Sequence, residues 1–92
     1  MSYLKKLPIH KLKIDQSFVA GLPEDRDDIS ISRAVIALGK SLGLSIVAEG
    51  VETESQAEFL AKESCDELQG YLFLKPVPAE TFVQLLQESA QD

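Results

Sequence analysis

Residues 45–53 read SIVAEGVET: an apolar run ends in a carboxylate, which a glycine and a second carboxylate follow. Residues 44–49 are too apolar on both faces for a half-exposed strand, as expected for a parallel sheet that is covered on both sides. The run carries Glu49 to a turn that begins at Gly50. Because parallel α/β folds place their chemistry at the carboxyl ends of strands, this pattern predicts a functional role for Glu49.

Two more strands are predicted, one before this run and one after it. Residues 10–15 (HKLKID) alternate between apolar and charged side chains, which indicates a strand with one charged face. Residues 68–74 (LQGYLFL) are rich in aromatic and aliphatic groups, and a Lys-Pro pair stops the run. The sequence therefore predicts three strands.

A long helix is predicted between the first two strands. Residues 29–42 carry apolar side chains spaced three and four apart, with Asp27 or Asp28 as the N-cap and Gly43 after the end. Its apolar residues are Ile31, Ala34, Val35, Leu38 and Leu42. The preceding residues 16–28 contain glycine, proline and a run of charges, so they are predicted to be mostly loop.

Two further helices follow the second and third strands. Residues 53–64 begin with a capping box, in which Gln56 reaches back to Thr53. Pro78 opens the last helix, and residues 1–8 have the pattern of a final helical turn. A strand followed by a helix, three times over, predicts parallel strands and the α/β class.

Composition limits the class of protein. The 92 residues suffice for one small domain, and 45% hydrophobic with 26% charged residues is typical of a folded protein. A formal net charge of −6 argues against a general DNA- or RNA-binding surface, which needs clustered Lys and Arg. The single cysteine, Cys65, allows no internal disulfide, and no apolar run is long enough for a membrane helix. A reducing, cytoplasmic location is therefore expected.

Charged residues gather at the predicted strand ends. If the first two strands are neighbours, Lys13, Asp15 and Glu49 converge at one end of the sheet. An ammonium beside two carboxylates is suited to holding a divalent cation and its bound water. A structural ion pair between Lys13 and an acid explains the same spacing, and spacing alone favours this simpler interpretation.

Two other positions carry a weaker signal. Glu52 either orients Glu49 or a neighbouring loop, or is a solvated acid at a helix N-terminus. Gln69 and Gly70 place an amide beside a close approach of the backbone, an arrangement that suits a nucleobase or a phosphate. A lone Gln-Gly pair does not by itself identify a ligand.

Three segments resemble the C-terminal part of EAL domains in order and spacing. They are KIDQSFV at residues 13–19, SLGLSIVAEGVET at residues 41–53 and CDELQGYLFLKPV at residues 65–77. EAL domains are bacterial phosphodiesterases that hydrolyse the second messenger cyclic di-GMP to linear pGpG on a TIM-barrel-like (βα)₈ scaffold. The resemblance implies that this chain is a partial TIM-like barrel.

The resemblance also implies roles for particular residues. Lys13 corresponds to the family's lysine that contacts the catalytic water. Glu49 corresponds to a late glutamate that is associated with a metal ion and proposed as a base, so both are candidate catalytic residues. Glu52 is similar to the acid that braces an active-site loop. Gln69 is similar to the glutamine that lines the substrate pocket, and Asp15 is placed with it among the substrate-binding residues.

The chain also departs from the family pattern. A TIM barrel needs about 250 residues and eight βα units, whereas this sequence supplies three. The E-A-L signature, the asparagine and glutamate of the middle strands and the paired aspartates are absent. Residues 1–92 are therefore expected to be a single C-terminal fragment of an EAL domain that is catalytically incomplete and binds neither the Mg²⁺ nor the Mn²⁺ of the intact domain. Open sheet edges and an apolar interior face are expected to cause self-association.

Two alternatives remain open at the level of sequence. The chain is either a non-enzymatic EAL-like interaction or ligand-sensing module that kept the late motifs, or a purely structural fragment without a ligand. Titration with cyclic di-GMP, with and without Mg²⁺, distinguishes the interaction or ligand-sensing module from an incomplete phosphodiesterase.

Overall fold

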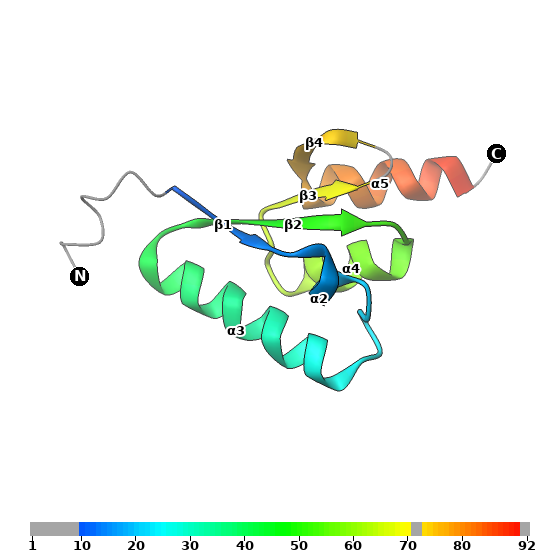
Figure 1. Cartoon of the computed structure of the whole chain (residues 1–92). Helices are drawn as coiled ribbons and strands as arrows, with labels where there is room; N and C mark the ends of the chain where they lie inside the picture. The colour runs from blue at the N-terminus through cyan, green and yellow to red at the C-terminus, as the bar shows by residue number, and fades with distance from the viewer. Residues whose placement is uncertain (1–9, 71–72, 91–92) are drawn as a thin grey trace.

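A four-stranded sheet with the order β1-β2-β3-β4 forms the centre of the computed structural model, which describes residues 10–70 and 73–90 (Figure 1). In chain order the elements are β1 (Lys11–Ile14), α2 (Gln16–Val19), α3 (Arg26–Leu42), β2 (Ser45–Val51), α4 (Glu54–Lys62), β3 (Glu67–Gly70), β4 (Phe73–Pro78) and α5 (Ala79–Ala90). None of the helices in the described part of the chain is long and apolar enough to cross a membrane.

The first three strands are parallel, as the alternation of strands and helices predicts. Ile14 of β1 lies opposite Ala48 of β2, and Ala48 lies opposite Leu68 of β3. The α/β class and the parallel pairing of these strands are therefore confirmed. The predicted final turn of a helix over residues 1–8 lies outside the described residues.

The predicted single strand over residues 68–74 is wrong. Strand β4 pairs antiparallel with β3, with Leu68 opposite Val77, so a hairpin replaces the single strand. Pro78 was expected to open the last helix, but it is the last residue of β4. The helix α5 begins at the next residue, Ala79. A continuous run of strand-forming residues does not specify where the chain reverses, and Gly70 was the only local signal of a break.

The prediction of a loop over residues 16–28 is partly wrong. Residues 16–19 form the short helix α2, which is too short for a periodic signal. The helix α3 begins at Arg26, because the side chain of Asp25 accepts a hydrogen bond from the Asp28 amide at 3.0 Å and acts as the N-cap. The cap is therefore neither Asp27 nor Asp28.

The predicted capping box of α4 is confirmed. The Thr53 hydroxyl accepts from the Gln56 amide at 3.1 Å, and the Gln56 side chain accepts from the Thr53 amide at 3.1 Å. These two bonds satisfy amide groups that have no partner within the helix. They also fix the direction in which the chain leaves β2.

The hydrophobic core lies between the sheet and its helices. Side chains alternate along a strand, so Ile14, Ile46 and Leu68 share one face of the sheet. They belong to one buried cluster together with Leu60 of α4 and Phe82 of α5. The opposite face of the sheet carries the side chains that lie between these residues in the sequence.

A bulge at the end of β2 modifies the alternation. Ala48 lies opposite Leu68 and Val51 lies opposite Gly70, so β2 has one more residue than β3 in this segment. Gly50 has a φ of 73°, the left-handed conformation that glycine adopts readily. The bulge returns Val51 to the hydrophobic core and leaves Glu49 on the other face.

The buried side of α3 consists mainly of small residues. Ser32, Ile36 and Gly39 are buried, and a Cβ added to Gly39 would collide with the Cδ1 atom of Ile46. Of the apolar residues that repeat along the helix, Leu38 is 54% exposed and Ile31 is 36% exposed. Close approach of the helix to the sheet therefore decides which side of α3 is buried.

The exposed apolar residues of α3 lie on the flank that faces away from α4. On the opposite flank, Arg33 binds Glu63 at 3.1 Å and lies over the ring of Phe59, 5.6 Å from its centroid. We call Ile31, Ala34, Val35, Leu38 and Leu42 the α3 stripe. Since β1 is an edge strand, the stripe lies beside an open edge of the described sheet.

The prediction of an apolar interior face is wrong. Lys11 and Lys13 alternate along β1 with Leu12 and Ile14, which pack in the hydrophobic core. Lys11 forms an ion pair with Glu67, and Lys13 forms one with Glu49. The face of the sheet that the helices leave uncovered is therefore charged. Its lysines reduce edge-to-edge pairing of β1, because charged residues are a common protection of edge strands.

Candidate functional site

An ion pair joins the carboxyl ends of β1 and β2. The Nζ atom of Lys13 lies 3.4 Å from the Oε2 atom of Glu49. Lys13 is opposite Val47, so Glu49 stands two residues further along the neighbouring strand and on the same face. The side chains are 64% and 33% exposed, which leaves both accessible to a ligand. The predicted convergence of Lys13 and Glu49 is confirmed, whereas their catalytic roles stay predictions.

A second ion pair lies beside the first. The Nζ atom of Lys11 lies 3.0 Å from the Oε1 atom of Glu67, so this pair crosses β2 and connects β1 with β3. Val47 is fully buried at the centre of β2. Neither Lys11 nor Glu67 was predicted as a site residue from the sequence. The only signal was the alternation of Lys11 with Leu12 in the first strand.

Asp15 caps the short helix α2. Its Oδ2 atom accepts hydrogen bonds from the Ser17 hydroxyl at 2.6 Å and from the Ser17 amide at 3.0 Å. These bonds lower the pKa of the Asp15 carboxyl, the side-chain bond contributing most and the backbone bond less. The carboxylate is therefore held at the start of α2, and its predicted contact with a substrate stays a prediction.

The Gln56 side chain holds the loop after β2. The Gln56 Oε1 atom accepts from the Glu52 amide at 2.8 Å, and its Nε2 atom donates to the Ala20 carbonyl at 3.5 Å. Gln56 is 6% exposed, whereas Glu52 is exposed. The capping-box motif predicted the contact between Gln56 and Thr53, but it did not predict the hydrogen bond between Gln56 and Ala20. That the carboxylate of Glu52 braces a loop stays a prediction.

Gln69 lies on β3, next to Gly70, where the backbones of β3 and β2 approach each other closely. A Cβ added to Gly70 would lie 2.7 Å from the carbonyl carbon of Val51 and collide with the carbonyl oxygen. The expected close approach of the backbone at Gly70 is therefore confirmed. Gln69 alternates with Leu68, so it shares the charged face with Glu67 and is half-buried there.

The charged face offers too few oxygen ligands for a magnesium site of its own. Mg²⁺ requires near-octahedral oxygen coordination, in which carboxylates act together with substrate phosphates and water. Glu49 contributes one carboxylate, and it is already paired with Lys13. No group of three or more His, Cys, Asp or Glu side chains suited to a metal ion occurs within residues 10–70 and 73–90. The described residues therefore fit a part of a metal site and not a complete one.

Polar contacts at the opposite end of the strands are structural. Asp66 accepts from the Ile46 amide at 2.8 Å and from Lys40 at 3.0 Å. Burial acts to raise the pKa of the Asp66 carboxyl, but the hydrogen bonds from Ile46 and Lys40 and the charge of Lys40 lower it overall. Cys65 is buried, and this burial raises the pKa of its thiol to about 11, which keeps the thiol protonated near neutral pH, as is typical of a packing residue.

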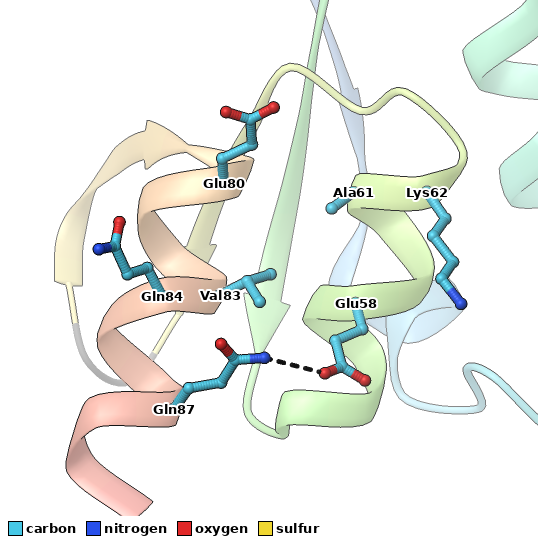
Figure 2. Close-up of a pocket in the computed structure, with 7 residues that line it drawn as sticks. All are labelled: Glu58, Ala61, Lys62, Glu80, Val83, Gln84 and Gln87. Carbon is cyan, nitrogen blue, oxygen red and sulfur yellow. Dashed lines mark hydrogen bonds between the residues drawn. The ribbon is translucent and has the colours of Figure 1, made fainter.

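A groove of about 380 Å³ lies between α4 and α5 and is separate from the charged face (Figure 2). Ala61 and Val83 form its apolar floor, and a hydrogen bond of 3.3 Å joins Gln87 to Glu58 across it. None of the predicted site residues lines this groove. It is a gap between neighbouring helices rather than a part of the candidate site.

Comparison with known proteins identifies the relatives of the chain. The model of the EAL domain family matches residues 1–76. The bifunctional diguanylate cyclase/cyclic di-GMP phosphodiesterase MucR of Pseudomonas aeruginosa is 55% identical over 78 residues, which are 85% of this chain and 11% of that protein. The chain therefore spans about a tenth of this curated relative.

Solved structures agree with this result. The PaMucR phosphodiesterase in complex with cyclic di-GMP superposes with a TM-score of 0.70 at 53% identity, over 88% of this chain and 33% of the solved chain. A manganese and cyclic di-GMP complex of BlrP1 from Klebsiella pneumoniae gives a TM-score of 0.68 at 29% identity, over 86% of this chain and 20% of that one. The predicted class, a part of a TIM-like barrel, is confirmed. On these sequence and structural grounds, the chain belongs to the EAL domain family.

Proposed function

We propose that this chain supplies the Lys13–Glu49 pair to a phosphodiesterase that hydrolyses cyclic di-GMP to pGpG. The observation that carries the proposal is the 3.4 Å contact between the two side chains at neighbouring strand ends. Lys13 orients the water that attacks the phosphorus, and Glu49 takes its proton. The P–O3′ ester bond breaks, and the ribose 3′ oxygen leaves and takes up a proton to become a hydroxyl group. Gln69 and Asp15 contact the nucleotide, and Glu52 supports the adjoining loop.

The proposed phosphodiesterase uses Mg²⁺ or Mn²⁺ when the barrel is complete. A divalent cation supplies a Lewis acid and an acidified water in phosphoryl chemistry. Glu49 is the one proposed ligand from this chain, and the other oxygen ligands come from outside it. A cytoplasmic location is part of the proposal, because a single buried cysteine gains nothing from an oxidising compartment.

The isolated chain is expected to hydrolyse no cyclic di-GMP. One carboxylate and one ammonium do not assemble a metal-bound nucleophile. Purified protein is incubated with cyclic di-GMP and either Mg²⁺ or Mn²⁺, and pGpG is measured by chromatography. Release of pGpG that depends on metal and disappears in Glu49→Gln would show that the chain is a complete enzyme.

The same samples distinguish the interaction module from the incomplete enzyme. Saturable binding of cyclic di-GMP without metal, measured by calorimetry and unchanged by Lys13→Met, would favour a ligand-sensing module. Binding that is weak, and weaker still in Lys13→Met, is the result expected for a partial active site.

We also propose that the chain self-associates, and that the α3 stripe is the contact surface with a second copy. The stripe is apolar and lies beside the open edge of β1. If the β1 strands of two copies paired with their buried faces aligned, Lys11 and Lys13 of one copy would face the lysines of the other. Like charges directly opposite each other destabilise a strand pair. The helix is therefore the favoured contact, and the strand edge is not.

Replacing Leu38 with Glu is expected to convert self-associated protein into monomer. The new carboxylate would be buried against apolar side chains of the second copy, which costs several kcal/mol of association free energy. Analytical ultracentrifugation over a range of concentrations measures the change. Ala37→Glu, which adds the same charge to an exposed position outside the stripe, should associate like the wild type. A wild-type chain that stays monomeric at millimolar concentration would contradict the proposal.

A further inference from the structure

The two ion pairs on the charged face admit a second pairing scheme. Lys13 and Glu67 both lie opposite Val47, one on each side of β2, so they stand at the same level of the sheet. Lys11 lies one level lower, opposite Ser45, and reaches diagonally to Glu67. Glu67 is therefore as well aligned with Lys13 as it is with Lys11.

Strand spacing places the alternative pair within reach. Two strands that flank a third are about 10 Å apart, and a lysine and a glutamate side chain that lean toward each other span that distance. The two lysines and two glutamates alternate with the buried residues of their strands, so all four are on one face. A lysine ammonium is a flexible point charge, so its position depends on which carboxylate is available.

We propose that Lys11 and Glu67 are positioning residues for Lys13. Lys11 occupies the Glu67 carboxylate at 3.0 Å, and this contact leaves Glu49 as the remaining acid partner of the Lys13 ammonium in the described structure. Without Lys11, Glu67 competes with Glu49 for Lys13 and draws the ammonium away from the strand end. The relevance of this arrangement to hydrolysis rests on the proposed function, whereas the competition itself does not.

The proposal makes a specific prediction about paired substitutions. Lys11→Met should weaken the contact between Lys13 and Glu49, and adding Glu67→Gln should restore it, because the competing charge is then gone. Glu67→Gln alone should leave the contact unchanged. A purely structural bridge between β1 and β3 predicts the opposite, since Lys11→Met and Glu67→Gln would then be equally harmful and the double variant would not recover.

Nuclear magnetic resonance of the whole chain measures the contact without any nucleotide. Lys13→Met is introduced into four proteins: the wild type, Lys11→Met, Glu67→Gln and the double variant. In each of them, the change that Lys13→Met causes in the ¹³C chemical shift of the Glu49 carboxyl carbon reports the ion pair. The change should fall to about half in Lys11→Met, because two half-buried carboxylates, 33% exposed in Glu49 and 29% in Glu67, then share one ammonium about equally. It should return to the wild-type value in the double variant. Amide spectra of the four proteins verify that each is folded.

Two results would overturn the proposal: an undiminished Glu49 response in Lys11→Met, or a double variant that behaves like Lys11→Met. The series is separate from the test of the proposed function. Hydrolysis is tested in a chimera that carries this chain in place of the matching part of the MucR EAL domain. If this chimera lacked hydrolytic activity, the proposed function would be rejected, while the spectra would still decide the pairing. In an active chimera, the rate should fall in Lys11→Met and recover in the double variant.

Discussion

A chimera that carries this chain in place of the matching part of the MucR EAL domain is expected to lose about 10²- to 10⁴-fold of its cyclic di-GMP hydrolysis when Lys13 becomes Met. This range is the usual contribution of general acid–base catalysis, and without the Lys13 ammonium the water that Glu49 deprotonates is no longer held in place. The 55% identity over 78 residues makes the exchange feasible. Lys13→Met keeps the aliphatic stem and removes the ammonium, so the value of kcat should fall while the barrel stays folded.

Matched variants separate chemistry from stability in this experiment. Glu49→Gln removes the other member of the 3.4 Å pair and should cause a loss of similar size. Lys62→Met makes the same chemical change at an exposed position on α4 and should leave the rate unchanged. When two residues act as a unit, the rate losses caused by replacing each of them are not additive. The double variant of Lys13 and Glu49 should therefore be no slower than the slower of the two single variants. A chimera with Lys13→Met that retains full activity would refute the assigned role.

Gly70→Ala is expected to destabilise the chain by about 3 kcal/mol or more, the upper part of the range for overpacking substitutions. The added methyl group would meet the backbone carbonyl of Val51, with the carbonyl carbon 2.7 Å away. A backbone group in a paired strand cannot rotate aside as a side chain can, so β3 would have to separate from β2. Urea denaturation followed by circular dichroism measures the loss.

Gly43→Ala provides the control for glycine replacement as such. Gly43 has a φ of 73° after the end of α3, but no atom lies within 4 Å of an added Cβ. Its replacement should therefore cost only about 1–2 kcal/mol, the penalty for the left-handed conformation. If Gly70→Ala were no more harmful than Gly43→Ala, the close approach of β2 and β3 would not be essential to the fold.

Local patterns were the most reliable guide to the secondary structure. The alternation HKLKID located β1, the apolar run ending at Glu49 located most of β2, and the Thr53–Gln56 pair located the start of α4. Each of these signals depends on residues that are close together in the sequence. The hairpin of β3 and β4 and the short helix α2 had no comparable local signal.

The candidate site could be predicted only in part, because some of its contacts have no local signal in the sequence. Lys13 and Glu49 were each selected because they stand at a strand end, and the parallel direction of their strands follows from the order of elements. That the two strands are neighbours was shown by the structure. The contact of Gln56 with Ala20 did not follow, because no strand pairing joins these residues and the contact depends on how α4 packs against the end of α2.

The sequence by itself determined the α/β class, the parallel direction of the first three strands and the placement of a lysine and a glutamate at the ends of the first two strands. These features depend on periodicity, capping and chirality, which act over short stretches of chain. Only the tertiary structure decided which carboxylate each lysine binds and which side of α3 is buried. The first depends on the register of three strands, and the second on the fit of Gly39 against Ile46, so both arise from distances between distant parts of the chain.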